Sequence, residues 1–220
     1  YLGIKNLRAP ANLSLLFQID AGTASATDVL KPGETQWGYL RSDVWHTLPS
    51  TAVLNDSTYG FQKPGLVVIS VPKEASMQHS AMPTDMIWLR AHIQRPPESA
   101  SRTLKLHTQA TLAELAVDTQ ALSDYAQHLQ DGLAAQTISR LKQRDAAIKR
   151  VTQPYASFDG RGQEDDADYF RRCSERLRHR NRAITPWDFE RLVLQAFPEV
   201  FKVKCLPHSD AAGNTRAGET

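Results

Sequence analysis

The sequence has few of the residues that build disulfide frameworks or cross membranes. It contains two cysteines, Cys173 and Cys205, in 220 residues, so no disulfide framework is expected and a reducing compartment is favoured. Its apolar runs are all shorter than the roughly 18 residues that span a bilayer, and no signal-peptide pattern opens it. With 26 Lys and Arg against 24 Asp and Glu, the net charge of +2 does not point to a nucleic-acid partner.

Motifs of catalytic sites are also missing. The sequence has no G-x-S-x-G, no H-E-x-x-H and no P-loop. Zinc-type ligands do occur late in the chain: Cys173, His179, Cys205 and His208. However, Cys173 and His179 diverge by about 240° round a helix, so the cysteines are better read as small core residues. We therefore expect a protein that is not an enzyme, with no catalytic residues, no cofactor and no metal.

Residues 1–95 have the pattern of a β-sandwich-like domain. Apolar runs of strand length occur at 13–19 and 65–72, and an alternating run occurs at 85–93. The segments "TQWGYL" and "VWHTL" flank residues 41–43, which predicts a hairpin. Short strands separated by Gly, Pro, Asn and Asp favour a sandwich over a βαβ unit.

Aromatic residues in this first region offer a rival function. Four of them might stack against a sugar ring: Trp37, Tyr39, Trp45 and Trp88. Aromatic side chains of a sandwich more often fill its core. A carbohydrate- or surface-binding β-sandwich module is nevertheless kept as the alternative function.

The remaining residues, 96–220, predict a mixed α+β domain. A Pro- and Ser-rich break at 94–102 sets the boundary near residue 95. Strand alternation follows at 103–108, then a thin helical stripe at 112–130, then a short strand and a loop at 146–162. The chain starts in strand-like sequence without Met and closes on a polar stretch that completes no element, so we expect a fragment of a longer chain, incomplete at its C-terminus.

The residues from 164 onward predict the first of two well-marked helices, which carries the arginines of 171–182. Acidic residues at 164–168 precede the arginines, an order that complements the helix macrodipole. Phe170, Cys173 and Leu177 make an apolar stripe at spacings i, i+3 and i+7.

The second helix has a clear start signal. Thr185 is a good N-cap, Pro186 suits the first helical position, and Asp188 completes a pattern that resembles a capping box. The expected buried stripe consists of Phe189, Leu192, Val193 and Ala196. Pro198 should close the helix, and residues 200–206, "VFKVKCL", predict a strand with Phe201, Val203 and Cys205 facing inward.

Six arginines crowd the expected helix at 171–182: Arg171, Arg172, Arg176, Arg178, Arg180 and Arg182. They are spread round the helix, and residues 164–206 hold nine Lys and Arg against eight Asp and Glu. Nucleic-acid binding by the 171–182 helix is a rival interpretation. A helix that binds nucleic acid would gather its positive charges on one face, so this interpretation is the weaker one. We expect a solvated or interface-facing helix whose exposed arginines contribute little to the fold.

One long motif joins these features. The segment "EDDADYFRRCSERLRHRNRAITPWDFERLVLQAFPEVFKVKCLPH" resembles the baseplate J-like proteins of contractile phage tails and of phage-tail-like contractile injection systems. Its matching parts are residues 172–183, 184–190 and 197–206. Upstream, "IKRVTQPYASFDGRGQED" is also similar, with Asp159 where that family commonly has glycine. The resemblance extends over nearly the whole chain and is most specific over 151–207.

The resemblance implies a non-enzymatic structural subunit of the baseplate wedge, and makes 96–220 a wedge domain. The implied partners are other wedge subunits, including a copy or paralogue of this chain, and baseplate proteins near the sheath and tube, without nucleic acid or membrane insertion. The implied location is the bacterial cytoplasm during assembly, then a phage tail or an extracellular phage-tail-like particle. The six arginines would form the interface, and the structural joint would consist of Thr185, Pro186, Trp187 and Asp188.

Overall fold

A computed structural model of the chain describes residues 1–25, 30–31, 33–116, 122–197 and 200–209. The chain divides into two compact units, Tyr1–Leu115 and Ala116–Thr220. The described strands all belong to the first unit, and the three described α-helices belong to the second. This arrangement confirms the predicted α+β fold class.

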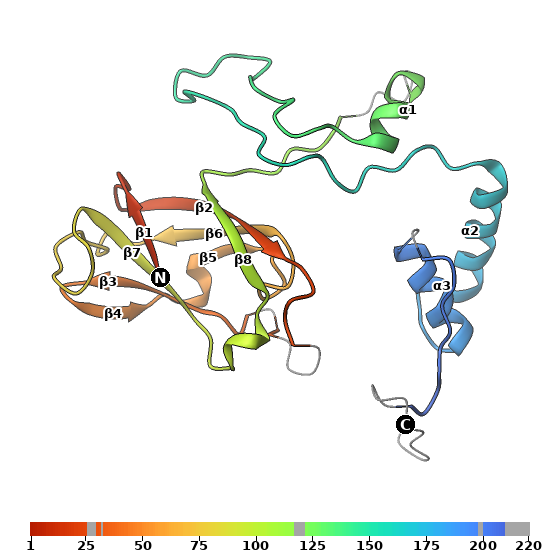
Figure 1. The fold of residues 1–220 in the computed structure, drawn as a ribbon, viewed down its shortest axis with the longest axis horizontal. Coiled ribbons are helices and arrows are strands. Elements are labelled where there is room, and N and C mark those ends of the chain that lie inside the picture. Colours follow the sequence, from red (N-terminus) through yellow and green to blue (C-terminus); the bar gives the residue numbers. More distant parts are fainter. Residues whose placement is uncertain (26–29, 32, 117–121, 198–199, 210–220) are drawn as a thin grey trace. The chain divides into compact units, whose positions relative to one another are not determined.

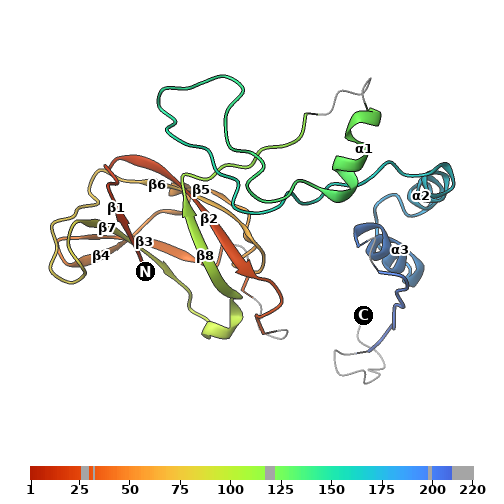
Figure 2. The same ribbon diagram turned by 45° about the horizontal axis from the view of Figure 1, so that its top comes forward.

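The first unit consists of two antiparallel four-stranded sheets (Figures 1 and 2). One sheet has the order β1 (Leu2–Lys5), β7 (Met86–His92), β3 (Gln36–Arg41) and β4 (Val44–Thr47). The other has the order β5 (Val53–Asp56), β6 (Gly65–Val71), β2 (Ala11–Asp20) and β8 (Arg102–Thr108). The strands predicted at 13–19, 65–72 and 85–93 are therefore confirmed.

Alternating side chains from both sheets form the core of the first unit. Leu15 of β2 and Val67 of β6 are fully buried, as is Leu89 of β7 in the other sheet. All three belong to one apolar cluster, which also contains Trp37 of β3. Because successive side chains of a strand point to opposite faces, one apolar face from each sheet is enough to enclose this core.

The predicted hairpin joins β3 and β4. Ser42 and Asp43 have φ angles of 45° and 64°, the left-handed backbone that two-residue hairpin turns require. This turn places Leu40 opposite Trp45. Trp37 and Tyr39 then share the core-facing side of β3.

The boundary between the units lies beyond the one predicted near residue 95. β8 pairs with β2, with Leu106 opposite Phe17, so this strand belongs to the sandwich. The Pro- and Ser-rich segment before it forms a short 3₁₀ turn, Pro97–Ser99, and Ser99 is buried. The oxygen of Ser99 accepts a hydrogen bond from the Leu30 N–H at 2.9 Å, so this segment is tied into the first unit.

The second unit contains α1 (Leu122–Asp131), α2 (Asp166–His179) and α3 (Pro186–Ala196) (Figure 1). Part of the helix predicted at 112–130 falls at 117–121, outside the described residues, as does Pro198. The structure pairs neither 146–162 nor 200–206 into a sheet, so the strand predictions there are wrong. Among the helices that the structure describes, none is long and apolar enough to cross a membrane.

Candidate interface on the α2–α3 hairpin

The start of α2 is fixed by acidic side chains. Asp165 is the N-cap, and its Oδ1 accepts a hydrogen bond from the Asp168 N–H at 2.7 Å. Glu164 forms a bidentate ion pair with Arg172, whose Nε lies 3.0 Å from Oε1 and whose Nη2 lies 2.8 Å from Oε2. Hydrogen bonding to Arg172 lowers the pKa of the Glu164 carboxyl below its ordinary value. The first two turns of α2 are therefore bonded to Glu164 and Asp165, which directly precede the helix.

The turn between the helices is built around a buried histidine. α2 ends where Arg180 and Asn181 take positive φ angles of 49° and 57°. Nδ1 of His179 accepts a hydrogen bond from the Asn181 N–H at 3.0 Å, and the His179 oxygen accepts one from the Arg182 N–H at 2.8 Å. His179 is only 4% exposed. Sequence reasoning considered it only as a zinc ligand and missed this role, because no local pattern marks a turn-forming histidine.

α3 begins with the capping box that the sequence predicts. Thr185 Oγ1 accepts a hydrogen bond from the Asp188 N–H at 3.3 Å, and Asp188 Oδ2 accepts one from the Thr185 N–H at 2.7 Å. Asp188 Oδ2 also accepts from the Ile184 N–H at 3.2 Å. These bonds, above all the one from the Thr185 backbone, lower the pKa of the buried Asp188 carboxyl. Pro186 at the first helical position needs no hydrogen-bond acceptor there.

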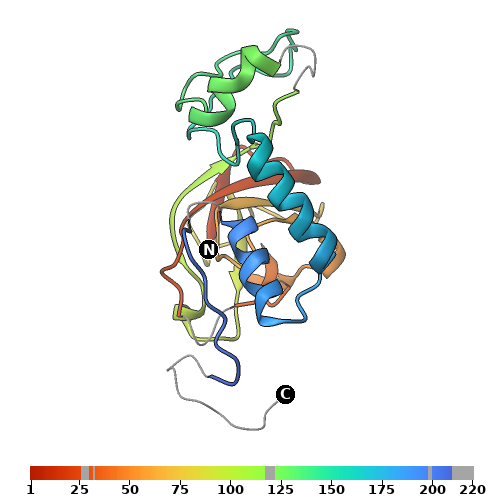
Figure 3. The same cartoon turned by 90° about the vertical axis from the view of Figure 1, so that its right-hand side faces the viewer.

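Trp187 connects the two helices. The Arg178 guanidinium lies 4.1 Å from the centre of its ring, and the Arg191 guanidinium lies 5.6 Å away. The His179 ring of α2 is 6.4 Å from the Trp187 ring, and Arg191 pairs with Glu175 at 3.3 Å. Figure 3 shows α2 and α3 side by side, as these contacts require. Arg178 therefore packs on the Trp187 ring within the hairpin, a contact that the sequence did not predict.

The six predicted interface arginines fall into two groups. Arg171 pairs with Asp168 at 2.6 Å, Arg172 pairs with Glu164, and Arg178 covers Trp187. The others are Arg176, Arg180 and Arg182. These three are exposed, and none of them has an ion-pair partner in the described part of the chain.

The apolar stripes of both helices are left largely uncovered by the described residues. In α2, Phe170 is 68% exposed and Leu177 is 77% exposed, because the side that faces α3 carries Arg172, Glu175 and His179 instead. In α3, Phe189 and Val193 are exposed as well. Ala196 is exposed too, and Leu192 is partly buried, so the prediction of a buried α3 stripe is wrong for Phe189, Val193 and Ala196.

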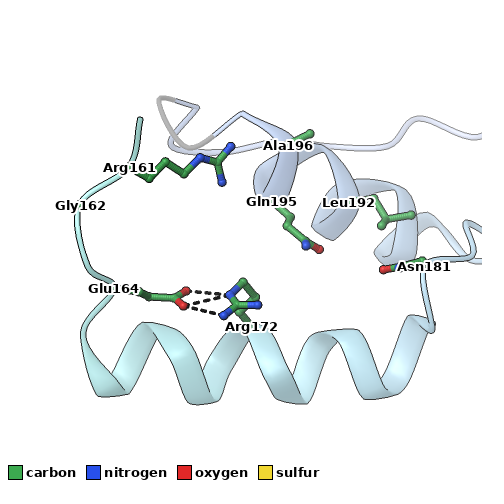
Figure 4. Close-up of a pocket in the computed structure, with 8 residues that line it drawn as sticks. All are labelled: Arg161, Gly162, Glu164, Arg172, Asn181, Leu192, Gln195 and Ala196. Atoms are coloured by element: carbon green, nitrogen blue, oxygen red, sulfur yellow. Dashed lines mark hydrogen bonds and ion pairs between the residues drawn. The ribbon is translucent and has the colours of Figure 1, made fainter. Parts of the chain in front are cut away.

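A hollow of about 820 Å³ opens between residues 161–164, which precede α2, and the helices α2 and α3 (Figure 4). It is lined by Arg161, Gly162, Glu164, Arg172, Asn181, Leu192, Gln195 and Ala196. Arg172 is already neutralised by Glu164, whereas the Arg161 side chain points into the hollow without an ion-pair partner among the described residues. The hollow is therefore suited to an anionic side chain more than to a cationic one.

Neither the metal site nor the sugar-binding platform considered from the sequence is formed by the described residues. Over the described residues, no group of three His, Cys, Asp or Glu side chains is placed to hold a metal ion. Cys173 and Cys205 are free thiols, each partly buried. Trp37 lies in the sandwich core at 2% exposure, and Trp45 and Trp88 are partly buried. Trp37 therefore cannot contribute to a sugar-binding platform.

Comparison with known proteins identifies a matching family. The family model described as "Baseplate protein PVC11-like" matches residues 1–217. No curated protein matches the chain. The matched range contains the first unit, all but the last three residues of the second, the six arginines and the capping box. It agrees with the resemblance to baseplate proteins found in the sequence, although it names the PVC11-like family and not the baseplate J-like one.

Proposed function

The chain belongs to the PVC11-like family of baseplate proteins, and on that premise we propose that it is a structural wedge subunit of baseplate J-like type. Its role is to help assemble the baseplate of a contractile phage-tail-like injection system. The family supports a structural component of a phage-tail-like particle, and therefore a non-enzymatic role. The division at residue 95 is replaced in this proposal by a sandwich to Leu115 and a wedge domain from Ala116.

The α2–α3 hairpin supports the wedge role most directly. The turn between its helices is fixed by the Thr185–Asp188 capping box and by Trp187, whose ring lies close to two guanidinium groups, and we infer that this joint is stiff. Three arginines on and beside it are left without carboxylate partners in the described chain. A stiff element with unpaired charges suits selection of a partner, because electrostatic complementarity fixes register and rejects wrong partners.

The proposed partners follow from the same surface. They are other wedge subunits, including a copy or paralogue of this chain, and baseplate proteins near the sheath and tube. Carboxylates of these neighbours would form bidentate pairs with Arg176, Arg180 and Arg182. Neither nucleic acid nor membrane insertion has a part in this function. Assembly would take place in the bacterial cytoplasm.

Charge reversal of the unpaired arginines tests this function. We expect the triple variant Arg176→Glu, Arg180→Glu, Arg182→Glu to fold but to give few assembled particles, because like charges would then face the partner's carboxylates. Arg144→Glu, at an exposed position in a loop of the same unit, is the control and should assemble normally. Particles are counted by electron microscopy, and folding is checked by circular dichroism. Normal particle numbers from the folded triple variant would refute the interface.

A further inference from the structure

The segment after α3 is docked on that helix but has no strand beside it among the described residues. Residues 201–206 run back along α3 (Figures 1 and 3), and the Glu190 carboxylate of the helix holds them. Glu190 Oε1 accepts a hydrogen bond from the Cys205 N–H at 3.0 Å and pairs with Lys204 Nζ at 3.3 Å. The bond from the Cys205 backbone, followed by the Lys204 contacts, lowers the pKa of Glu190.

Most backbone groups of this segment have no partner within the described chain. Among the backbone N–H groups of residues 201–206, that of Cys205 has a hydrogen-bond acceptor in the described chain. Those without one belong to Phe201, Lys202, Val203, Lys204 and Leu206. A row of open N–H and C=O groups is what the edge of a sheet presents to an incoming strand.

The side chains also have the pattern of a strand with one covered face. Val203 and Cys205 are partly buried, whereas Lys202 and Lys204 are exposed. Phe201 is 99% exposed, an unusual state for a phenyl ring that could be covered by a neighbour. Residues 203–206 therefore keep the alternation that predicts a strand, whereas the prediction that Phe201 faces inward is wrong, and no described strand pairs with the segment.

We propose that residues 201–206 form a β-augmentation site that pairs with a strand of a neighbouring baseplate protein. The incoming strand would place an apolar side chain against Phe201 and a carboxylate beside Lys202, which has no ion-pair partner in the described chain. Its backbone would bind the open N–H and C=O groups. This proposal rests on the proposed function and names the chemistry of one partner.

The lysines argue against a second copy of the same segment as the occupant. A pairing of two copies that keeps their apolar faces together and overlaps over at least four of these residues places a lysine opposite a lysine. That arrangement holds for parallel and antiparallel pairing, because same-face residues share the same parity in the sequence. Like charges directly opposite each other destabilise a strand pair, so an acidic and apolar strand is a better occupant than a copy.

Hydrogen exchange tests the pairing. We expect the amides of 201–206 to exchange about tenfold or more slowly in assembled particles than in the free full-length chain, because they gain acceptors there. Fast exchange in both states would overturn the proposal. Slow exchange in the free chain would overturn it too, because the pairing strand would then lie in this same chain.

A carbodiimide cross-link and a charge reversal identify the partner. In assembled particles, Lys202 should form an amide with an Asp or Glu of another baseplate protein, located by mass spectrometry. Lys202→Glu should reduce particle numbers severalfold, and Lys142→Glu, an exposed lysine in a loop of the same unit, should not. A cross-link to a second copy, or normal assembly of Lys202→Glu, would sink the proposal.

Different results would refute the augmentation site and the structural function. A chain that enters the baseplate while residues 201–206 exchange freely refutes the augmentation site and leaves the structural function intact. A chain that is absent from assembled particles refutes the proposed function, and the augmentation site with it.

Discussion

The contact between Arg178 and Trp187 gives the sharpest test of how the hairpin is held. The guanidinium lies 4.1 Å from the ring centre, well inside the roughly 6 Å over which a cation attracts an aromatic face. Because Arg178 is exposed, the contact should contribute about 0.5–1 kcal/mol to hairpin stability. Arg191 is farther from the ring, at 5.6 Å, and already pairs with Glu175, so its share should be smaller.

The change is Arg178→Ala, and its matched control is Arg182→Ala, which removes an exposed arginine without a described partner. We expect Arg178→Ala to lower the free energy of local opening of α3 by about 1 kcal/mol. The control should stay within about 0.5 kcal/mol of the parent. Hydrogen exchange of the α3 amides in the full-length chain is the suitable assay, because the two units need not unfold together.

A double-mutant cycle isolates the contact itself. In a Trp187→Leu background the ring is gone, so Arg178→Ala should then cost less than about 0.3 kcal/mol. If Arg178→Ala cost the same with and without the ring, or if Arg182→Ala weakened α3 equally, the cation–π account of this joint would be wrong.

Three further predictions concern capping, acid and backbone strain. Thr185→Val, which keeps the shape but removes the capping hydroxyl, should destabilise α3 by about 1 kcal/mol in the same exchange assay. The pKa of Asp188 is lowered on folding, so its stabilisation is complete above the ordinary value of 3.8 and is lost as the pH falls through the lower folded pKa; Asp188→Asn should flatten that acid loss in a pH series of melts. Gly60→Ala should lower the melting temperature more than Gly22→Ala, because both have positive φ but the new Cβ at residue 60 would lie 2.6 Å from the Leu30 oxygen.

Local patterns were enough to predict most strands of the first unit and the start of α3. Strand alternation and turn residues act over a few positions, which is why the β3–β4 hairpin and β6 could be found from the sequence. The same holds for the capping box, whose two hydrogen bonds join residues only three apart, Thr185 and Asp188.

Long-range pairing was not visible in local patterns. β8 pairs with β2 across some ninety positions of sequence, with Leu15 opposite Thr108, so a Pro- and Ser-rich turn was mistaken for a domain boundary. Periodicity likewise predicts that α2 has an apolar stripe but not what covers it. The side that meets α3 is polar, with Glu175 bonded to Arg191, and this leaves Phe170 exposed.

A reconstruction of the assembled particle tests the central claim most directly. The account predicts that the chain lies in the baseplate, and that Arg176, Arg180 and Arg182 contact carboxylates of an adjacent subunit. It would be contradicted by a particle in which the chain lies outside the baseplate, or in which these arginines face open solvent.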